Sequence, residues 1–111
     1  MQHSMNLHDA PFCKIKKGLK TVEMRLFDQR RKSIKVGDTI LFTNNCTDEQ
    51  MVVSVTSVEV FETFQQLYNY YDKVAIGYMP SEVANPDDML LYYTKEQIAL
   101  HGVVAIGIKV Q

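Results

Sequence analysis

The fold is decided by the stretch Gly18-Leu19-Lys20-Thr21-Val22-Glu23-Met24-Arg25, in which a glycine leads into an alternating run of apolar and polar side chains. Over residues 21–26 the apolar Val22, Met24 and Leu26 alternate with polar residues. A period of two is typical of a β-strand with one buried face. We therefore expect a strand that buries the apolar set and displays Glu23 and Arg25 together on the opposite face.

Outward from this strand, similar patterns predict further short elements. β-rich or alternating runs predict strands over residues 3–7, 39–43, 51–61 and 103–110, the third of them central and bent near Ser57. Helix signals predict a helix over residues 9–17 with Asp9 as N-cap and Gly18 after its end, an amphipathic helix that starts at Thr63, a helical turn over residues 81–84, and a helix between Thr94 and Gly102.

These elements predict an α+β fold. The strands are too close together for regular βαβ crossovers, which favours a mostly antiparallel sheet. We expect a small β-barrel of about five or six mostly antiparallel strands with two or three short flanking helices. A plain α+β sandwich is the alternative.

Length and composition are those of one ordinary globular domain over residues 1–111. The chain has 111 residues, of which 46% are hydrophobic and 23% charged. No apolar run approaches the roughly 20 residues that span a bilayer, so we expect a cytoplasmic protein that does not contact membranes. Cys13 and Cys46 stand in no metal-ligand spacing, and we interpret both as reduced thiols. We expect neither a bound metal ion nor a cofactor.

Charge is distributed unevenly along the chain. Residues 14–38 hold nine basic and three acidic residues, whereas the remainder holds three basic and ten acidic residues. Such a basic segment suits an anionic ligand, with phosphate as the leading candidate. A solvated basic surface without a ligand is the alternative.

The pattern G-x-K-x-x-E-x-R, followed by a basic stretch and by Gly37-Asp38 before an apolar strand, resembles the ASCH domain (activating signal cointegrator homology), a branch of the PUA-like β-barrels. Further segments are similar to this family, so that the resemblance covers most of the chain: Pro11-Phe12, Ile15-Lys16-Lys17-Gly18, Tyr92-Tyr93-x-Lys95-Glu96 and Gly102-Val103-Val104. The resemblance implies a PUA-like barrel with a cleft that binds RNA or a nucleotide.

The side chains of the motif suit such a ligand. Glu23 and Arg25 lie two residues apart on one strand and so share a face, and Lys20 lies at its mouth if Gly18 turns the chain. In this hypothesis Lys20 and Arg25 bind phosphate, and Glu23 accepts hydrogen bonds from a base or sugar. The cleft then takes RNA or a small nucleotide or nucleoside. A structural ion pair without function is the alternative.

The neighbouring basic segment supplies candidates for the rim of this cleft. Arg30 and Arg31 are the candidate ligand-binding residues there, and Lys32 and Lys35 belong to the same segment. Contact with phosphate and a solvated loop are equally compatible with the sequence.

The sequence leaves open whether the protein is an enzyme. Some ASCH proteins are similar to amidohydrolases that act on N4-acetylcytidine through a lysine, a threonine and a glutamate. Lys20 matches the lysine, but Glu23 occupies the threonine position, so that Thr21 and Glu96 are the substitutes to consider. In a ribonuclease, Lys20 and Arg25 stabilise the phosphate and Glu23 acts as the base. Lys20 and Glu23 are therefore the candidate catalytic residues.

Protein recognition is a third possibility, and an apolar patch near Tyr92 and Tyr93 is the place to look for it. The sequence does not determine the oligomeric state.

Overall fold

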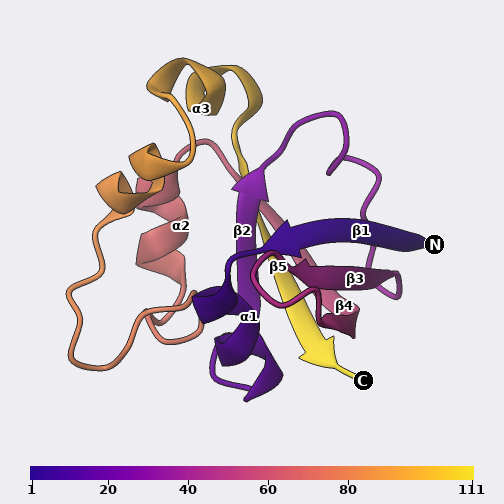
Figure 1. The fold of residues 1–111 in the computed structure, drawn as a ribbon. Coiled ribbons are helices and arrows are strands. Elements are labelled where there is room, and N and C mark those ends of the chain that lie inside the picture. The colour runs from indigo at the N-terminus through magenta and orange to yellow at the C-terminus, as the bar shows by residue number, and fades with distance from the viewer.

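The computed structural model describes residues 1–111 and contains one five-stranded sheet, whose strand order is β1-β3-β4-β5-β2 (Figure 1). The strands are β1 (Gln2–Leu7), β2 (Val22–Leu26), β3 (Thr39–Asn44), β4 (Gln50–Phe61) and β5 (Val103–Val110). β1 pairs with β3 in parallel, and every other pairing is antiparallel. The sheet curls into a half-barrel, so that β1 and β3 run across β2 and β5 in Figure 1.

This architecture confirms the expected α+β fold with a small, mostly antiparallel, barrel-like sheet. All five predicted strands are present, with ends that differ by at most one residue. β4 is the central strand, and a register shift between Val55 and Ser57 provides the predicted bend. The sheet curls into a half-barrel, which corresponds to the expected barrel and not to the flat, helix-covered sheet of the sandwich alternative.

Three α-helices and one 3₁₀ helix flank the sheet. They are α1 (Asp9–Lys16), α2 (Phe64–Tyr70), η1 (Pro86–Leu91) and α3 (Lys95–His101). The Thr63 and Thr94 hydroxyls cap α2 and α3 as predicted, and the backbone of Gly18, with φ 79°, ends α1. None of these helices has both the length and the apolar composition needed to cross a bilayer.

Two local predictions about the helices are wrong. The N-cap of α1 is His8, because the Asp9 carboxylate instead accepts hydrogen bonds from Asn44 and Cys13. No helix forms over residues 81–84; the helical segment of this connection is η1, which begins at Pro86 and is capped by the Asn85 side chain. A proline suits the first helical position because its missing N–H is not needed there.

The sheet separates two hydrophobic clusters. Alternate residues of β5 serve both of them: Val104, Ile106 and Ile108 face the cluster with Phe12 and the β1, β3 and β4 side chains, and Val103 and Ala105 face the cluster under α2. Cys13 and Cys46 are both free thiols, as expected.

β2, which carries Glu23 and Arg25, is an edge strand and attaches to the sheet only through β5. Val22 and Met24 are buried in the cluster under α2, as the alternation predicts. The opposite face, expected to be displayed, is also covered: Glu23 is only 3% exposed. This expectation was wrong because the sheet curls, which places β1 over the face that carries Glu23 and Arg25.

Candidate functional site

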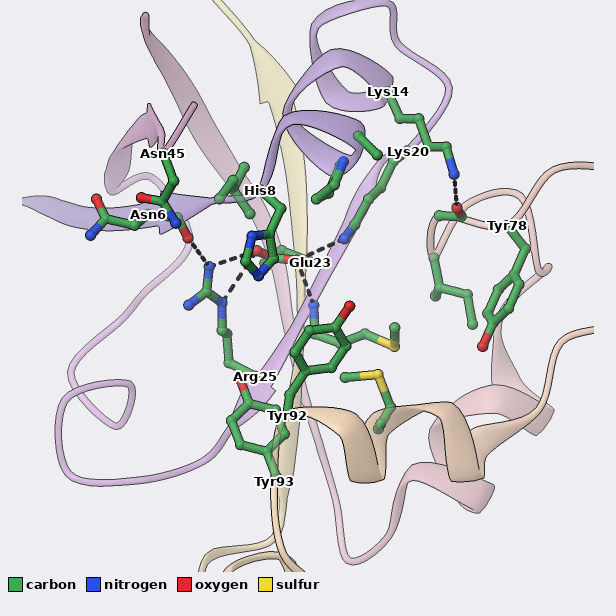
Figure 2. Close-up of a pocket in the computed structure, with 17 residues that line it drawn as sticks. Asn6, His8, Lys14, Lys20, Glu23, Arg25, Asn45, Tyr78, Tyr92 and Tyr93 are labelled. Carbon is green, nitrogen blue, oxygen red and sulfur yellow. Dashed lines mark hydrogen bonds and ion pairs between the residues drawn. The ribbon is translucent and has the colours of Figure 1, made fainter. Parts of the chain in front are cut away.

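A cavity of about 360 Å³ lies in the seam between β1 and β2, the two edge strands of the sheet (Figure 2). Asn6 and Leu7 line it from β1, residues 23–25 line it from β2, and α1, η1 and the turn near Gly77 close its sides. This volume is at the small end of the roughly 300–1,000 Å³ of pockets that hold small molecules. We call it the seam pocket.

The predicted trio comes together inside the seam pocket. Lys20 Nζ donates to Glu23 Oε1 at 2.8 Å, and Arg25 donates to Glu23 Oε2 through Nε at 3.2 Å and Nη2 at 3.0 Å. Figure 2 shows the three side chains pointing toward one another. The Lys20 side chain is 8% exposed and the Arg25 side chain 15%, so these are largely buried ion pairs.

Glu23 has no hydrogen-bonding capacity left for a ligand. Besides the two cations, its Oε1 accepts the backbone N–H of Met24 at 3.1 Å, which makes four hydrogen bonds in all. A carboxylate has about four lone-pair positions. Burial alone would raise the pKa of Glu23, but the charges and hydrogen bonds of Lys20 and Arg25 outweigh it and hold that pKa at about 2. The sequence analysis expected Glu23 to accept hydrogen bonds from a nucleobase or sugar, or to act as a general base. Both roles need a free lone pair, and this arrangement leaves none.

The two cations keep donors for a ligand. Lys20 uses one of its three N–H groups on Glu23, and Arg25 keeps both N–H groups of Nη1, since Nε and Nη2 bind Glu23 and the carbonyl of Asn6. Glu23 therefore fixes the direction of two cations that line the seam pocket and that keep unused donors.

Lys14, a residue not singled out by the sequence analysis, adds a third cation. Its Nζ donates to the carbonyl of Gly77 at 2.8 Å. Gly77 has φ +113°, and a Cβ there would lie 3.2 Å from Cδ and 3.7 Å from Nζ of Lys20. Both lysines thus pack against one glycine. Membership in the basic segment was the only sequence signal for Lys14, because its partner is 63 residues away.

Aromatic side chains form the other part of the pocket wall. The rings of His8 and Tyr92 are 6.3 Å apart at an angle of 35°, and Tyr92 is 59% exposed. Tyr93 instead stacks on Phe64 at 6.1 Å. Tyr78 is held by hydrogen bonds to Tyr68 and Asp88, and burial together with these bonds raises its pKa. The patch near Tyr92 and Tyr93, which the sequence analysis considered for protein recognition, therefore forms part of the pocket wall.

The other predicted residues lie outside the seam pocket. Arg30 donates weakly to the carbonyl of Ser4 on the edge of β1, and Arg31 pairs with Asp28 at 2.8 Å. Burial raises the pKa of Tyr93, a residue of the pocket wall, and the charges of Arg25 and Arg31 oppose that rise.

Thr21 and Glu96, the substitutes considered for the threonine and glutamate of the hydrolases, do not line the pocket. The basic residues Lys32 and Lys35 do not line it either. No Ser, Thr or Cys is among the lining residues. Nowhere in the chain do three His, Cys, Asp or Glu side chains gather in a way that could hold a metal ion.

Comparisons with known proteins agree with this fold. The model of the ASCH domain family matches residues 5–111. The crystal structure of the hypothetical protein PH0355 is similar over 100% of both chains, with 28% identity and a TM-score of 0.85. Protein PF0455 from Pyrococcus furiosus is similar over 99% of this chain and 97% of its own, with 27% identity and a TM-score of 0.74.

A more distant structure shares the fold alone. The ASCH domain from Lactobacillus crispatus has 16% identity and a TM-score of 0.62 over 98% of this chain and 79% of its own. No curated protein matches the chain.

Proposed function

Because the chain belongs to the ASCH domain family, which is PUA-like, we propose that it binds RNA or a small nucleotide and that the seam pocket is the binding site. The observation that carries this proposal is the arrangement around Glu23, which uses all its own acceptors to hold Lys20 and Arg25 in place. Fixed cations lose little conformational freedom when a ligand binds, which favours affinity.

The unused donors of the seam pocket suit a ligand rich in acceptors. Lys20 and the Nη1 group of Arg25 can donate to phosphate oxygens or to the carbonyl groups of a base. Glu23 acts in this proposal as a positioning residue and does not contact the ligand. This role differs from the direct contact expected from the sequence, and it still makes Glu23 necessary for binding.

The aromatic wall supplies the contact for a base. Tyr92 is exposed, and its ring lies beside His8 at the pocket. Bases of single-stranded RNA and of nucleotides stack on such rings, at about 1–3 kcal/mol per base. A nucleotide can therefore place its polar groups on the cations and its base on Tyr92. Arg30, which contacts Ser4 of β1, is then available to a longer RNA strand, whereas the Arg31 guanidinium is paired with Asp28.

Binding is favoured over hydrolysis by the contents of the pocket. The amidohydrolase mechanism considered in the sequence analysis uses an aliphatic hydroxyl, that of a threonine, as the nucleophile beside a base. No Ser, Thr or Cys lines the seam pocket, and Glu23, with a pKa of about 2, is a weak base.

The test is an NMR titration of the purified protein with a panel of nucleotides, N4-acetylcytidine and short RNAs at low and moderate salt. We expect amide shifts confined to the residues around the seam pocket, lost in Lys20→Ala and kept in the matched control Lys95→Ala, whose lysine is exposed on α3. The ligand itself should stay chemically intact. Loss of its acetyl or phosphodiester signal would show hydrolysis, and the absence of any shift would refute the proposal.

A further inference from the structure

The seam pocket has a charge and a donor set that fit one form of phosphate better than another. Its cations are Lys14, Lys20 and Arg25, and its one anion is Glu23. Tyrosine and histidine side chains complete the titratable groups that line it. Three positive charges against one negative charge leave an excess of two positive charges at the pocket.

A terminal phosphate monoester matches this excess. At neutral pH it carries a charge of about −1.5 to −2 and has three terminal acceptor oxygens. An internal phosphodiester of RNA carries one negative charge and has two non-bridging oxygens. The number of cationic groups, three, therefore equals the number of terminal oxygens in a monoester and is larger than the number of non-bridging oxygens in a diester.

The positions of the cations support a common target. Lys14 and Lys20 both reach Gly77, the first through a hydrogen bond to its carbonyl and the second by packing of its side chain against the glycine. Lys20 and Arg25 bind the two different oxygens of Glu23. Lys20 thus lies between the other two cations, and all three line the seam pocket (Figure 2).

Glu23 does not offset this preference by facing the ligand. Its four hydrogen bonds direct all its lone pairs to Lys20, Arg25 and the Met24 amide, so that its negative charge is opposed at short range by the two cations that it holds. The small volume of the cavity also suits a ligand that ends there, because an internal phosphodiester needs room for the chain to leave on both sides.

From these observations we propose that the seam pocket binds the terminal phosphate monoester of a nucleotide, as its dianion, in preference to an internal phosphodiester. The inference rests on the proposed function and names the ligand group that this site selects. A free mononucleotide and the phosphorylated end of an RNA both carry this group.

The test compares ligands that differ only in the phosphate. A nucleoside, its 5′-monophosphate and the methyl ester of that monophosphate are titrated into the wild-type protein by calorimetry at fixed salt. We expect the monophosphate to bind about tenfold more tightly than the methyl ester, the factor for one charge-assisted hydrogen bond, and the nucleoside to bind most weakly.

A variant assigns this preference to the pocket. Lys14→Met keeps the length of the side chain and removes one cation, so that the ratio of the two affinities should fall toward one. The matched control is Lys95→Met on α3, which should keep the ratio of the wild-type protein.

A second pair of ligands distinguishes the sources of the phosphate. One short RNA is prepared with a 5′-phosphate and with a 5′-hydroxyl. A preference for the phosphorylated RNA indicates an RNA end as the ligand, and a preference confined to the mononucleotide indicates a free nucleotide; both support the proposal.

The outcomes also separate this inference from the proposed function. Equal binding of the monophosphate and its methyl ester, still lost in Lys20→Ala, would overturn the preference and leave nucleotide binding in the seam pocket intact. Binding of none of these ligands would overturn both.

Discussion

Arg25 Nη2 lies 2.9 Å from the carbonyl oxygen of Asn6 and joins β2 to β1, the two strands at opposite edges of the sheet. A side chain thus connects the two edge strands of the half-barrel. In a closed barrel, backbone hydrogen bonds join the strands at this place. The same guanidinium binds Glu23, so that one residue serves both the sheet and the pocket.

Replacement of Arg25 by lysine should show how much of its contribution to stability and binding comes from its charge and how much from the planar geometry of its guanidinium. Lysine keeps the positive charge but lacks the planar fork that contacts Glu23 and Asn6 together. We expect a loss of about 1–2 kcal/mol in the free energy of unfolding and about tenfold weaker binding of a nucleotide, measured by urea denaturation and calorimetry. Arg30→Lys is the control, because Arg30 contacts Ser4 outside the pocket. Equal losses of mononucleotide binding in the two variants would contradict this account.

Glu23→Gln should destabilise the protein strongly. The substitution leaves Lys20 and Arg25 largely buried without a counter-charge, which costs about 3 kcal/mol when one partner of a buried ion pair is removed. Chemical denaturation at neutral pH measures the effect. Lys20→Met is the comparison, since Arg25 still pairs with Glu23 there, and we expect a smaller loss. A Glu23→Gln protein as stable as the wild type would show that the cations do not depend on Glu23.

Stability should also depend on acid pH through Glu23. Its pKa in the folded protein is about 2, below the ordinary value of 4.5, so that its contribution is complete above pH 4.5 and is lost as the pH falls toward 2. Asp38, whose pKa is lowered to about 2 first by its hydrogen bond from His3, acts in the same direction. Urea denaturation at a series of pH values from 6 to 2 should show that the free energy of unfolding falls more steeply in the wild type than in Glu23→Gln. Parallel curves for the two proteins would refute this role of Glu23.

Gly77→Ala should weaken binding as well as stability. Its φ of +113° disfavours any other residue, at about 1–3 kcal/mol, and the new Cβ would meet the Lys20 side chain at 3.2 Å. Gly37→Ala is a matched control, because Gly37 has φ +94° and no atom lies within 4 Å of the position that a Cβ would take there. Thermal unfolding should detect a loss in both variants, whereas calorimetry should detect weaker nucleotide binding only in Gly77→Ala. A binding defect shared by both would mean that backbone strain alone explains it.

Tyr92 and Tyr93 should differ in what they contribute. Tyr92→Ala removes an exposed ring, so we expect nucleotide binding to fall by about 1–3 kcal/mol with little change in stability. Tyr93→Ala removes a ring that stacks on Phe64 and should mainly lower the melting temperature. Fluorescence titration and thermal unfolding of both variants check this, and Tyr92→Phe should bind like the wild type. If Tyr92→Ala bound normally, the base would have to lie elsewhere.

The sequence predicted the elements whose signals are local. Alternation and capping residues located all five strands and two of the helix starts, because these patterns depend on neighbours within a few positions. The curl of the sheet depends on the pairing of β1 with β3, more than thirty residues apart, and no local pattern encodes it. For this reason the burial of Glu23 could not be predicted.

The site shows the same division. Lys20, Glu23 and Arg25 belong to one short motif, and the expectation that they meet was correct in its geometry. Lys14 is held at the pocket by its hydrogen bond to Gly77, and Gly77, Tyr78 and Tyr92 all belong to the connection between α2 and α3, whose path depends on tertiary packing. The sequence could not predict that all acceptor positions of Glu23 are used, because one of its hydrogen bonds comes from the backbone amide of Met24.

The strand order has a consequence for the time at which the site forms during folding. β2 carries Glu23 and Arg25, yet its only partner in the sheet is β5, the last strand in chain order. A chain that emerges from the ribosome N-terminus first therefore exposes the motif long before the strand that supports it is synthesised. In a refolding experiment, the capacity to bind a nucleotide should return no earlier than the protection of β5 amides from hydrogen exchange.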